Sequence, residues 1–230
     1  TRRFWPERVF PQVQAIVYSS TVFVGTEMGN LYALNAGNGA ERWPKYAAGA
    51  PILNSVAAAN GMVFFGAMDG AVYAVNAASG ALAWKNTVSP GMGFSTAPVF
   101  ADGKVMLGGR NGILYALSPD DGRILWQTDI GAPILQTAAY NSGRVFFGAM
   151  NMYVYALYTS NGTQAWKSAK ISGLAFKDYW PVVHQGQVLV RSLMLGANFF
   201  AFNETNGQPM PTLPQFQGKT MNGATAPPSV

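Results

Sequence analysis

The sequence contains no cysteine among its 230 residues. This absence excludes disulfide bonds, a thiolate nucleophile, a cysteine-ligated zinc site and covalent haem attachment within this stretch. Histidine occurs once, as His184, without a visible nucleophile partner for a catalytic triad, and a turn residue is the simpler interpretation. No stretch approaches the ~18 uninterrupted apolar residues of a transmembrane helix. The sequence therefore predicts no transmembrane segment and shows no catalytic motif.

Charge is also scarce, because Asp, Glu, Lys and Arg together make up 11% of the residues, against about 25% in a typical soluble domain. The net charge of +5 comes from few acids rather than many bases. No run of Lys or Arg marks a nucleic-acid or membrane surface, so we expect no nucleic-acid partner. Neutral polar residues must cover much of the surface. This composition favours a periplasmic, cell-surface or secreted protein.

What the sequence does contain is an internal repeat of Ala, a Gly six residues later and a Trp four residues after that Gly. The clearest copy is residues 74–84. Four copies are complete: Ala33, Gly39 and Trp43; Ala74, Gly80 and Trp84; Ala116, Gly122 and Trp126; Ala156, Gly162 and Trp166. The tryptophans recur every 40–42 residues, and a period of this size predicts a propeller or a solenoid.

Each repeat contains four short runs rich in Val, Phe, Tyr and Ile, separated by Gly, Asn and Asp. We predict strands over 9–18, 21–26, 30–35 and 40–46 in the first repeat, and over 52–58, 62–67, 71–76 and 81–87 in the second. Residues 62–65 and 145–147 are apolar without alternation, which predicts sheets covered on both faces. Four strands per repeat and two covered faces are typical of propeller blades.

The predicted fold is therefore an all-β propeller of four-stranded antiparallel blades, in one domain over residues 1–230. Five blades are expected at about 9–46, 52–87, 94–129, 133–168 and 177–217. A sixth is expected to begin at 224–230, where residues 225–227 repeat the Thr-Ala-Pro of residues 96–98. The fifth repeat is degraded, because Pro211 stands where its Trp is expected. We expect further blades, or a partner, to cover the two open edges of this array.

The pattern Ala-x-Asp/Asn-x-x-Thr/Ser-Gly-x-x-x-Trp resembles the tryptophan-docking motif of quinoprotein-like propellers. This group includes pyrroloquinoline quinone (PQQ)-dependent dehydrogenases and the lipoprotein of the outer-membrane assembly machine. The resemblance covers residues 9–168 strongly and 174–230 in weakened form, and it implies a ring of eight blades. It also implies that the repeated residues dock adjacent blades and hold no cofactor. These are Trp43, Trp84, Trp126 and Trp166, with Gly39, Gly80, Gly122 and Gly162.

A PQQ-dependent dehydrogenase would require a calcium site of Glu, Asn and Asp, an Arg beside the quinone and often vicinal cysteines, which are absent. The polar and aromatic residues expected near one end of the blades, the funnel end, lie in separate repeats. They are Glu27, Asp69, Arg110, Asn151, Asp178, Tyr179, Trp180 and Arg191. Oxygen ligands from such turns could converge on calcium, but solvated turn residues are the commoner explanation. We predict no cofactor and no metal, with PQQ and calcium as the alternative.

Three functions are compatible with this sequence. The first is a non-catalytic platform that binds proteins or cell-surface material. The second is part of a PQQ-dependent oxidoreductase, and the third is a carbohydrate- or small-ligand-binding module that uses Tyr179 and Trp180. Residues 171–180 and 192–198 form two unusually long loops, both expected at the funnel end of the fifth blade. Since long loops at one end of a scaffold usually carry binding, we predict the partner contact there.

Overall fold

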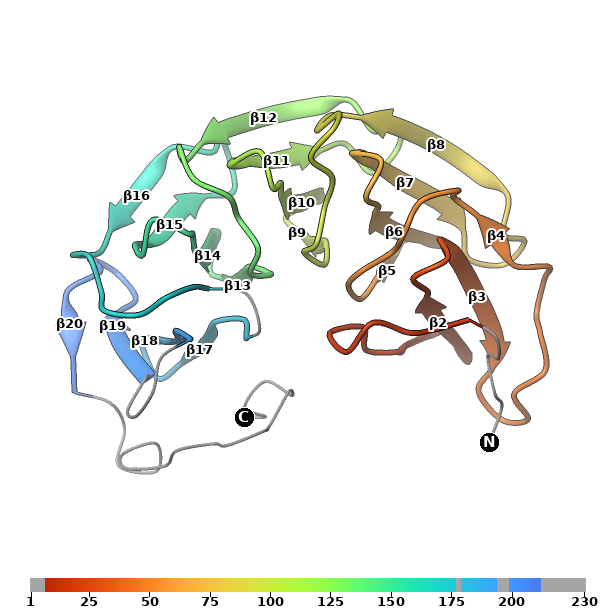
Figure 1. The fold of residues 1–230 in the computed structure, drawn as a ribbon, viewed down its shortest axis with the longest axis horizontal. Coiled ribbons are helices and arrows are strands. Elements are labelled where there is room, and N and C mark those ends of the chain that lie inside the picture. The colour runs from red at the N-terminus through yellow and green to blue at the C-terminus, as the bar shows by residue number, and fades with distance from the viewer. Residues whose placement is uncertain (1–6, 177–178, 194–198, 212–230) are drawn as a thin grey trace.

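The computed structural model describes residues 7–176, 179–193 and 199–211. These residues form five four-stranded antiparallel sheets and contain no helix. Figure 1 shows the sheets following one another along an arc, with the first strand of each sheet towards the centre and the last on the rim. The predicted all-β propeller architecture is confirmed. No helix of the described residues is long and apolar enough to cross a membrane.

The strands of each blade follow the order of the sequence. Blade one has β1 (Ile16–Tyr18), β2 (Thr21–Gly25), β3 (Asn30–Asn35) and β4 (Tyr46–Ala47). Blade two has β5 (Ala57–Ala59), β6 (Met62–Gly66), β7 (Ala71–Asn76) and β8 (Leu82–Thr87). Blade three has β9 (Val99–Ala101), β10 (Lys104–Gly108), β11 (Ile113–Leu117) and β12 (Ile124–Asp129). Blade four has β13 (Ala139–Asn141), β14 (Arg144–Gly148), β15 (Val154–Tyr158) and β16 (Gln164–Lys167). Blade five has β17 (Val182–His184), β18 (Gln187–Arg191), β19 (Phe199–Asn203) and β20 (Pro209–Met210).

The hydrophobic core consists mainly of layers between adjacent blades. Four clusters of buried side chains each combine residues of two successive sheets. The second strands show why the sequence is continuously apolar there: Val63, Phe64 and Phe65 on β6 are all fully buried, as are Val145, Phe146 and Phe147 on β14. Successive side chains of a strand point to opposite faces, so both faces of these sheets are covered. This confirms the interpretation of the unalternating runs.

Three strand boundaries differ from the prediction by more than one residue. The first strand of blade two is Ala57–Ala59 rather than 52–58, because the amide of Ile52 bonds to the carbonyl of Thr26 in blade one instead of to β6. The other two differences lie in blade one. The first strand is Ile16–Tyr18 rather than 9–18, because Val13 closes a turn with Phe10 and the amide of Gln14 bonds to Ser55 of blade two instead of to β2. The fourth strand of blade one is Tyr46–Ala47 rather than 40–46. Pro44 lies in the predicted segment and has no N–H to donate to a ladder. The predicted start of a sixth blade at 224–230 lies outside the described residues.

The two ends of the blades have different connections. At the funnel end, the second strand passes to the third and each blade connects to the next; at the opposite end, the turn end, lie the hairpins of strands one to two and three to four. The motif glycines occupy the hairpins between the third and fourth strands, with φ between +71° and +74°. Glycine adopts these angles without strain. The motif Asn76 caps the same turn by accepting from the amides of Ala78 and Ser79, both at 3.0 Å.

Candidate functional site

Each repeated tryptophan lies at the junction with the following blade. Its indole Nε1 donates to the carbonyl three residues before the next motif glycine. The four bonds are Trp43 to Ala77 (3.1 Å), Trp84 to Pro119 (2.8 Å), Trp126 to Thr159 (2.8 Å) and Trp166 to Glu204 (2.8 Å). The indole ring also fills the space beside that glycine. A Cβ added to Gly80, Gly122, Gly162 or Gly207 would lie 2.4–2.5 Å from the Cε3 atom of the docked tryptophan.

Blades one and five differ from this pattern. Beside Gly39, in the first blade, an added Cβ would meet no atom of the described residues within 4 Å. In blade five, Ala201 pairs with Met210, whereas the equivalent Ala74 in blade two pairs with Trp84. The geometry therefore gives every described junction a donor tryptophan from the earlier blade and a glycine from the later one, and blade five carries no donor.

Several predicted funnel-end residues are engaged by tyrosines of their own blades. Asp69 accepts from the hydroxyl of Tyr73 at 2.6 Å and from Nζ of Lys85 at 3.0 Å. Burial raises the pKa of Asp69, but these hydrogen bonds and that of the Ala71 amide outweigh it and leave the pKa below its usual value. Burial and the bond to Asp69 raise the pKa of Tyr73 to about 12. This cluster stabilises the blade rather than offering a free carboxylate.

The same position holds asparagine in the next two blades. Nδ2 of Asn111 donates to the Tyr115 hydroxyl at 2.6 Å, and Nδ2 of Asn151 donates to the Tyr155 hydroxyl at 2.9 Å. The Tyr115 hydroxyl in turn donates to the carbonyl of Val88, on the connection between blades, at 2.7 Å. Asn151, one of the predicted funnel-end residues, is therefore a structural partner of its own strand.

Blade one has Met28 at this position, and a carboxylate from elsewhere in the chain replaces the missing polar group. Glu7 accepts from the Tyr32 hydroxyl and from Nζ of Lys45, both at 2.6 Å, and from Thr26 and Asn30, both at 3.0 Å. Burial raises the pKa of Glu7, but the four hydrogen bonds outweigh it and bring the pKa down to about 2. Sequence reasoning missed Glu7. The signal was the Met at a position that is Asp or Asn in the next three blades.

Of the remaining predicted residues, Arg191 and Tyr179 come together, whereas Glu27 and Arg110 lie in separate turns. The amide of Glu27 donates to the carbonyl of Arg8 and that of Arg110 to the carbonyl of Gly93. The guanidinium of Arg191 lies over the Tyr179 ring, 4.0 Å from its centroid. It therefore covers one ring face on which a sugar could otherwise stack in the predicted carbohydrate site. Trp180 is half-buried. Asp178 lies outside the described residues.

The two long loops of the fifth blade meet each other. The amide of Leu174 donates to the carbonyl of Leu193, and the amide of Leu193 donates to the carbonyl of Ala175, both at 2.8 Å. Ser192 adds a bond to the carbonyl of Ser172 at 3.1 Å. The sequence predicted two long loops at one end, but not this ladder between them. Leu174 is 76% exposed and Leu193 is 40% exposed, so the ladder presents two apolar side chains to solvent.

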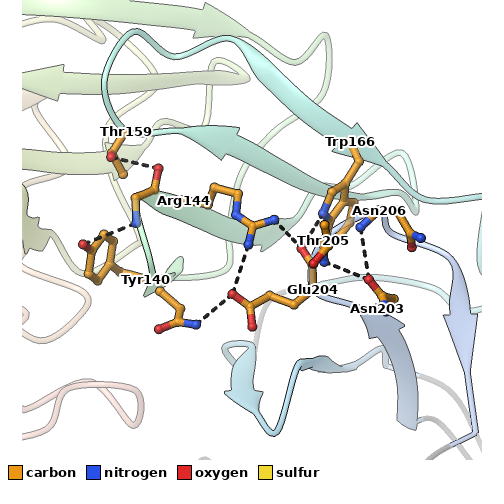
Figure 2. A network of polar contacts seen from close by, with 10 residues as sticks. Tyr140, Arg144, Thr159, Trp166, Asn203, Glu204, Thr205 and Asn206 are labelled. Carbon is orange, nitrogen blue, oxygen red and sulfur yellow. Dashed lines mark hydrogen bonds and ion pairs between the residues drawn. The ribbon is translucent and has the colours of Figure 1, made fainter.

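At the turn end, polar side chains join blades three, four and five. Figure 2 shows the carbonyl of Glu204 accepting from Nη1 of Arg144 (2.7 Å) and from the Trp166 indole (2.8 Å). Oε1 of Glu204 accepts from Asn141 at 2.7 Å and from Nη2 of Arg144 at 3.3 Å. Between blades three and four, Asp102 accepts from Tyr140 at 2.7 Å. The sequence did not reveal these contacts, because nothing local pairs residues 60 positions apart.

The repeat, the docked tryptophans and the sequential blades agree with a match to a family of known proteins. The family model described as outer membrane protein assembly factor BamB matches residues 7–139 and 111–210. The chain belongs to this family. No curated protein matches it.

Solved structures share the fold of this BamB-family chain. BamB from Moraxella catarrhalis superposes with a TM-score of 0.73 at 19% identity, over 86% of this chain and 62% of that one. The computationally designed protein Ika8 gives 0.73 at 14% identity, over 86% and 60%. The quinohemoprotein alcohol dehydrogenase ADHIIG from Pseudomonas putida HK5 gives 0.69 at 16% identity, over 87% and 41%. The chain thus spans about three fifths or less of the length of these structures, and the likeness shows the fold alone.

Quinoprotein dehydrogenases are among the structural neighbours, so the polar residues of the funnel end are compared with the ligands that a calcium and quinone site needs. The described residues contain no group of three or more acidic or histidine side chains that could hold a metal ion. The carboxylate of Asp69 forms an ion pair with Lys85, and the side-chain amide of Asn151 donates to the Tyr155 hydroxyl. These donors therefore do not fit a calcium-quinone site in the described part of this BamB-family chain.

Proposed function

We propose that this chain is a non-catalytic propeller platform that binds protein, with its contact surface at the funnel end of blade five. The observation that carries the proposal is the ladder between residues 172–175 and 192–193, which holds Leu174 and Leu193 out to solvent. Exposed apolar side chains on a hydrogen-bonded frame bind a partner with little loss of conformational entropy. Two methionines of funnel-end loops in other blades, Met28 and Met92, are also exposed, at 60% and 48%.

The family description supports a role in outer-membrane protein assembly. We therefore propose that the chain acts outside the cytoplasm and that its partner is a protein of that process. The low content of charged residues supports the same location. The engaged side chains of Asp69 and Asn151 support a structural rather than a catalytic role for the funnel end.

Hydrogen exchange tests the proposal directly. The chain would be measured alone and with outer-membrane assembly proteins of its source organism, and the amides of Leu174 and Leu193 should gain protection first. A matched pair of variants strengthens the test. Leu174→Lys with Leu193→Lys should abolish binding. Leu82→Lys with Ile124→Lys should not, although these side chains on the outer strands β8 and β12 are also apolar and are 47% and 41% exposed.

Two results would contradict the proposed protein-binding function. One is protection confined to the turn end, around Asn60, Asp102 and His184. The other is dye-linked oxidation of alcohols or sugars after addition of PQQ and calcium, which would establish the oxidoreductase instead.

A further inference from the structure

A cavity of about 320 Å³ lies between blades one and two at the turn end, far along the chain from the ladder of blade five. Its lining comes from the first hairpin of blade one, from the residue preceding Trp43 and from both hairpins of blade two. The lining residues are Tyr18, Ser19, Thr21, Arg42, Gly61, Asn76, Ala77 and Ala78. The volume is at the lower end of the range for small-molecule sites, about 300–1,000 Å³.

The equivalent space at two other junctions is occupied by a polar side chain. The backbone identifies the equivalent residues: Ala77 donates to Gly61, Thr159 to Gly143 and Glu204 to Gly186, at 2.8–2.9 Å. Each of them precedes a motif glycine by three residues and accepts a tryptophan indole. Between blades four and five, the Glu204 carboxylate meets Arg144 (Figure 2) and also accepts from Nδ2 of Asn141. Between blades one and two, Ala77 supplies only a methyl group, and the cavity remains.

A guanidinium group faces this cavity. Arg42 immediately precedes the docking Trp43, where the other repeats have Ala83, Leu125 and Ala165. Its Nη2 donates to the carbonyl of Ser20 at 3.2 Å, which holds the side chain over the first hairpin and leaves its other N–H groups available. Tyr18 also lines the cavity.

The charge and hydrogen-bonding capacity of the lining indicate the ligand. Among the described residues of the lining, Arg42 is the one cation and none carries a carboxylate. The hydroxyl of Tyr18 accepts from the amide of Gly61 at 3.0 Å, so its own hydrogen remains to be donated. A guanidinium and a hydroxyl that both donate into one cavity match a carboxylate, which forms short charge-assisted hydrogen bonds with such groups.

We propose that this cavity binds a small carboxylate ligand, whose carboxylate meets Arg42 as the Glu204 carboxylate meets Arg144 at the other junction. This inference is independent of the proposed function, because it concerns the opposite end of different blades. The ligand fills the gap left by Ala77 and bridges the first two blades. Binding therefore also stabilises this junction by mass action.

The test is a calorimetric titration of the full chain with succinate at constant ionic strength, beside inorganic phosphate and the neutral analogue succinamide. We expect succinate to bind more tightly than either. Arg42→Gln should weaken succinate binding about tenfold or more, since it removes the charged partner of the carboxylate. Arg123→Gln is the matched control, because Arg123 is an exposed arginine on another blade and should leave binding unchanged.

A second variant keeps the test decisive if Arg42→Gln alters folding. Ala77→Glu should place a carboxylate of the protein itself in the cavity, raise the melting temperature and abolish succinate binding. Absence of succinate binding at millimolar concentration would overturn the proposal. So would equal binding of phosphate, or binding that persists unchanged in both Arg42→Gln and Ala77→Glu.

Discussion

The indole of Trp84 occupies the space that a side chain at Gly122 would need. A Cβ on Gly122 would lie 2.4 Å from Cε3 of Trp84, closer than real Cβ contacts come. The same indole donates to the carbonyl of Pro119, three residues before this glycine. One glycine thus serves two purposes: it adopts a φ of +71° in its own hairpin, and it leaves a flat site for the tryptophan of the previous blade.

This relationship predicts that Gly122→Ala destabilises the chain more than Gly103→Ala. Both glycines have positive φ, +71° and +67°, but a Cβ at Gly103 would meet no atom within 4 Å. The backbone penalty of about 1–2 kcal/mol is common to both. Gly122→Ala adds overpacking against the indole, typically about 1–3 kcal/mol. Urea denaturation of both variants measures the difference, and equal losses would remove the docking role of Gly122.

Trp84→Ala should cost about 3–5 kcal/mol of unfolding free energy, because it removes a buried indole between two blades together with its hydrogen bond. Trp180→Ala is the matched control, since Trp180 is half-buried and lies outside the repeated positions. We expect a clearly smaller loss there. An equal or inverted order in chemical denaturation would refute a structural role for the repeated tryptophans.

Glu204→Ala should destabilise the junction of blades four and five by about 1–3 kcal/mol, because it removes the carboxylate partner of the partly buried Arg144. The double variant Arg144→Met with Glu204→Leu should be less damaging than Glu204→Ala, since it removes both charges. Asp121→Ala serves as the control: its pair with Arg123 is exposed on both sides, and the loss should be within measurement error. A similar loss for Glu204→Ala and Asp121→Ala would contradict a stabilising role of the Glu204–Arg144 pair between blades four and five.

The carboxylate of Glu7 predicts a defined acid sensitivity. Its pKa is about 2 in the folded chain against an ordinary value of 4.5, so the unfolded chain binds a proton more readily than the folded one. The stabilisation is therefore complete above about pH 4.5 and is lost as the pH falls towards 2. Thermal melts of the parent and Glu7→Gln should differ by a constant amount above pH 5 and converge towards pH 2. Parallel curves across this range would show that Glu7 is not stabilised in the fold.

Spacing and composition revealed most of the fold. Tryptophans every 40–42 residues and four apolar runs per repeat predict stacked blades, because a sheet with two apolar faces needs a neighbouring sheet on each face. The motif glycines were also predictable, since each stands in the tight turn between the third and fourth strands, where positive φ is needed. The strand limits of blade one were less predictable. Pro44 has no N–H to donate to a neighbouring strand, and the amide of Gln14 bonds to Ser55 rather than to β2.

The candidate sites depended on contacts that no local pattern encodes. Loop length alone placed a binding surface near residues 171–180 and 192–198, but only the fold joins Leu174 to Leu193 and leaves them exposed. Glu7 reaches Tyr32 across 25 positions and Arg144 reaches Glu204 across 60. The sequence by itself determined the propeller architecture, because periodic burial is a local property repeated along the chain. Only the tertiary structure decided which polar residues are engaged and where a cavity remains, because those depend on how unequal side chains meet between blades.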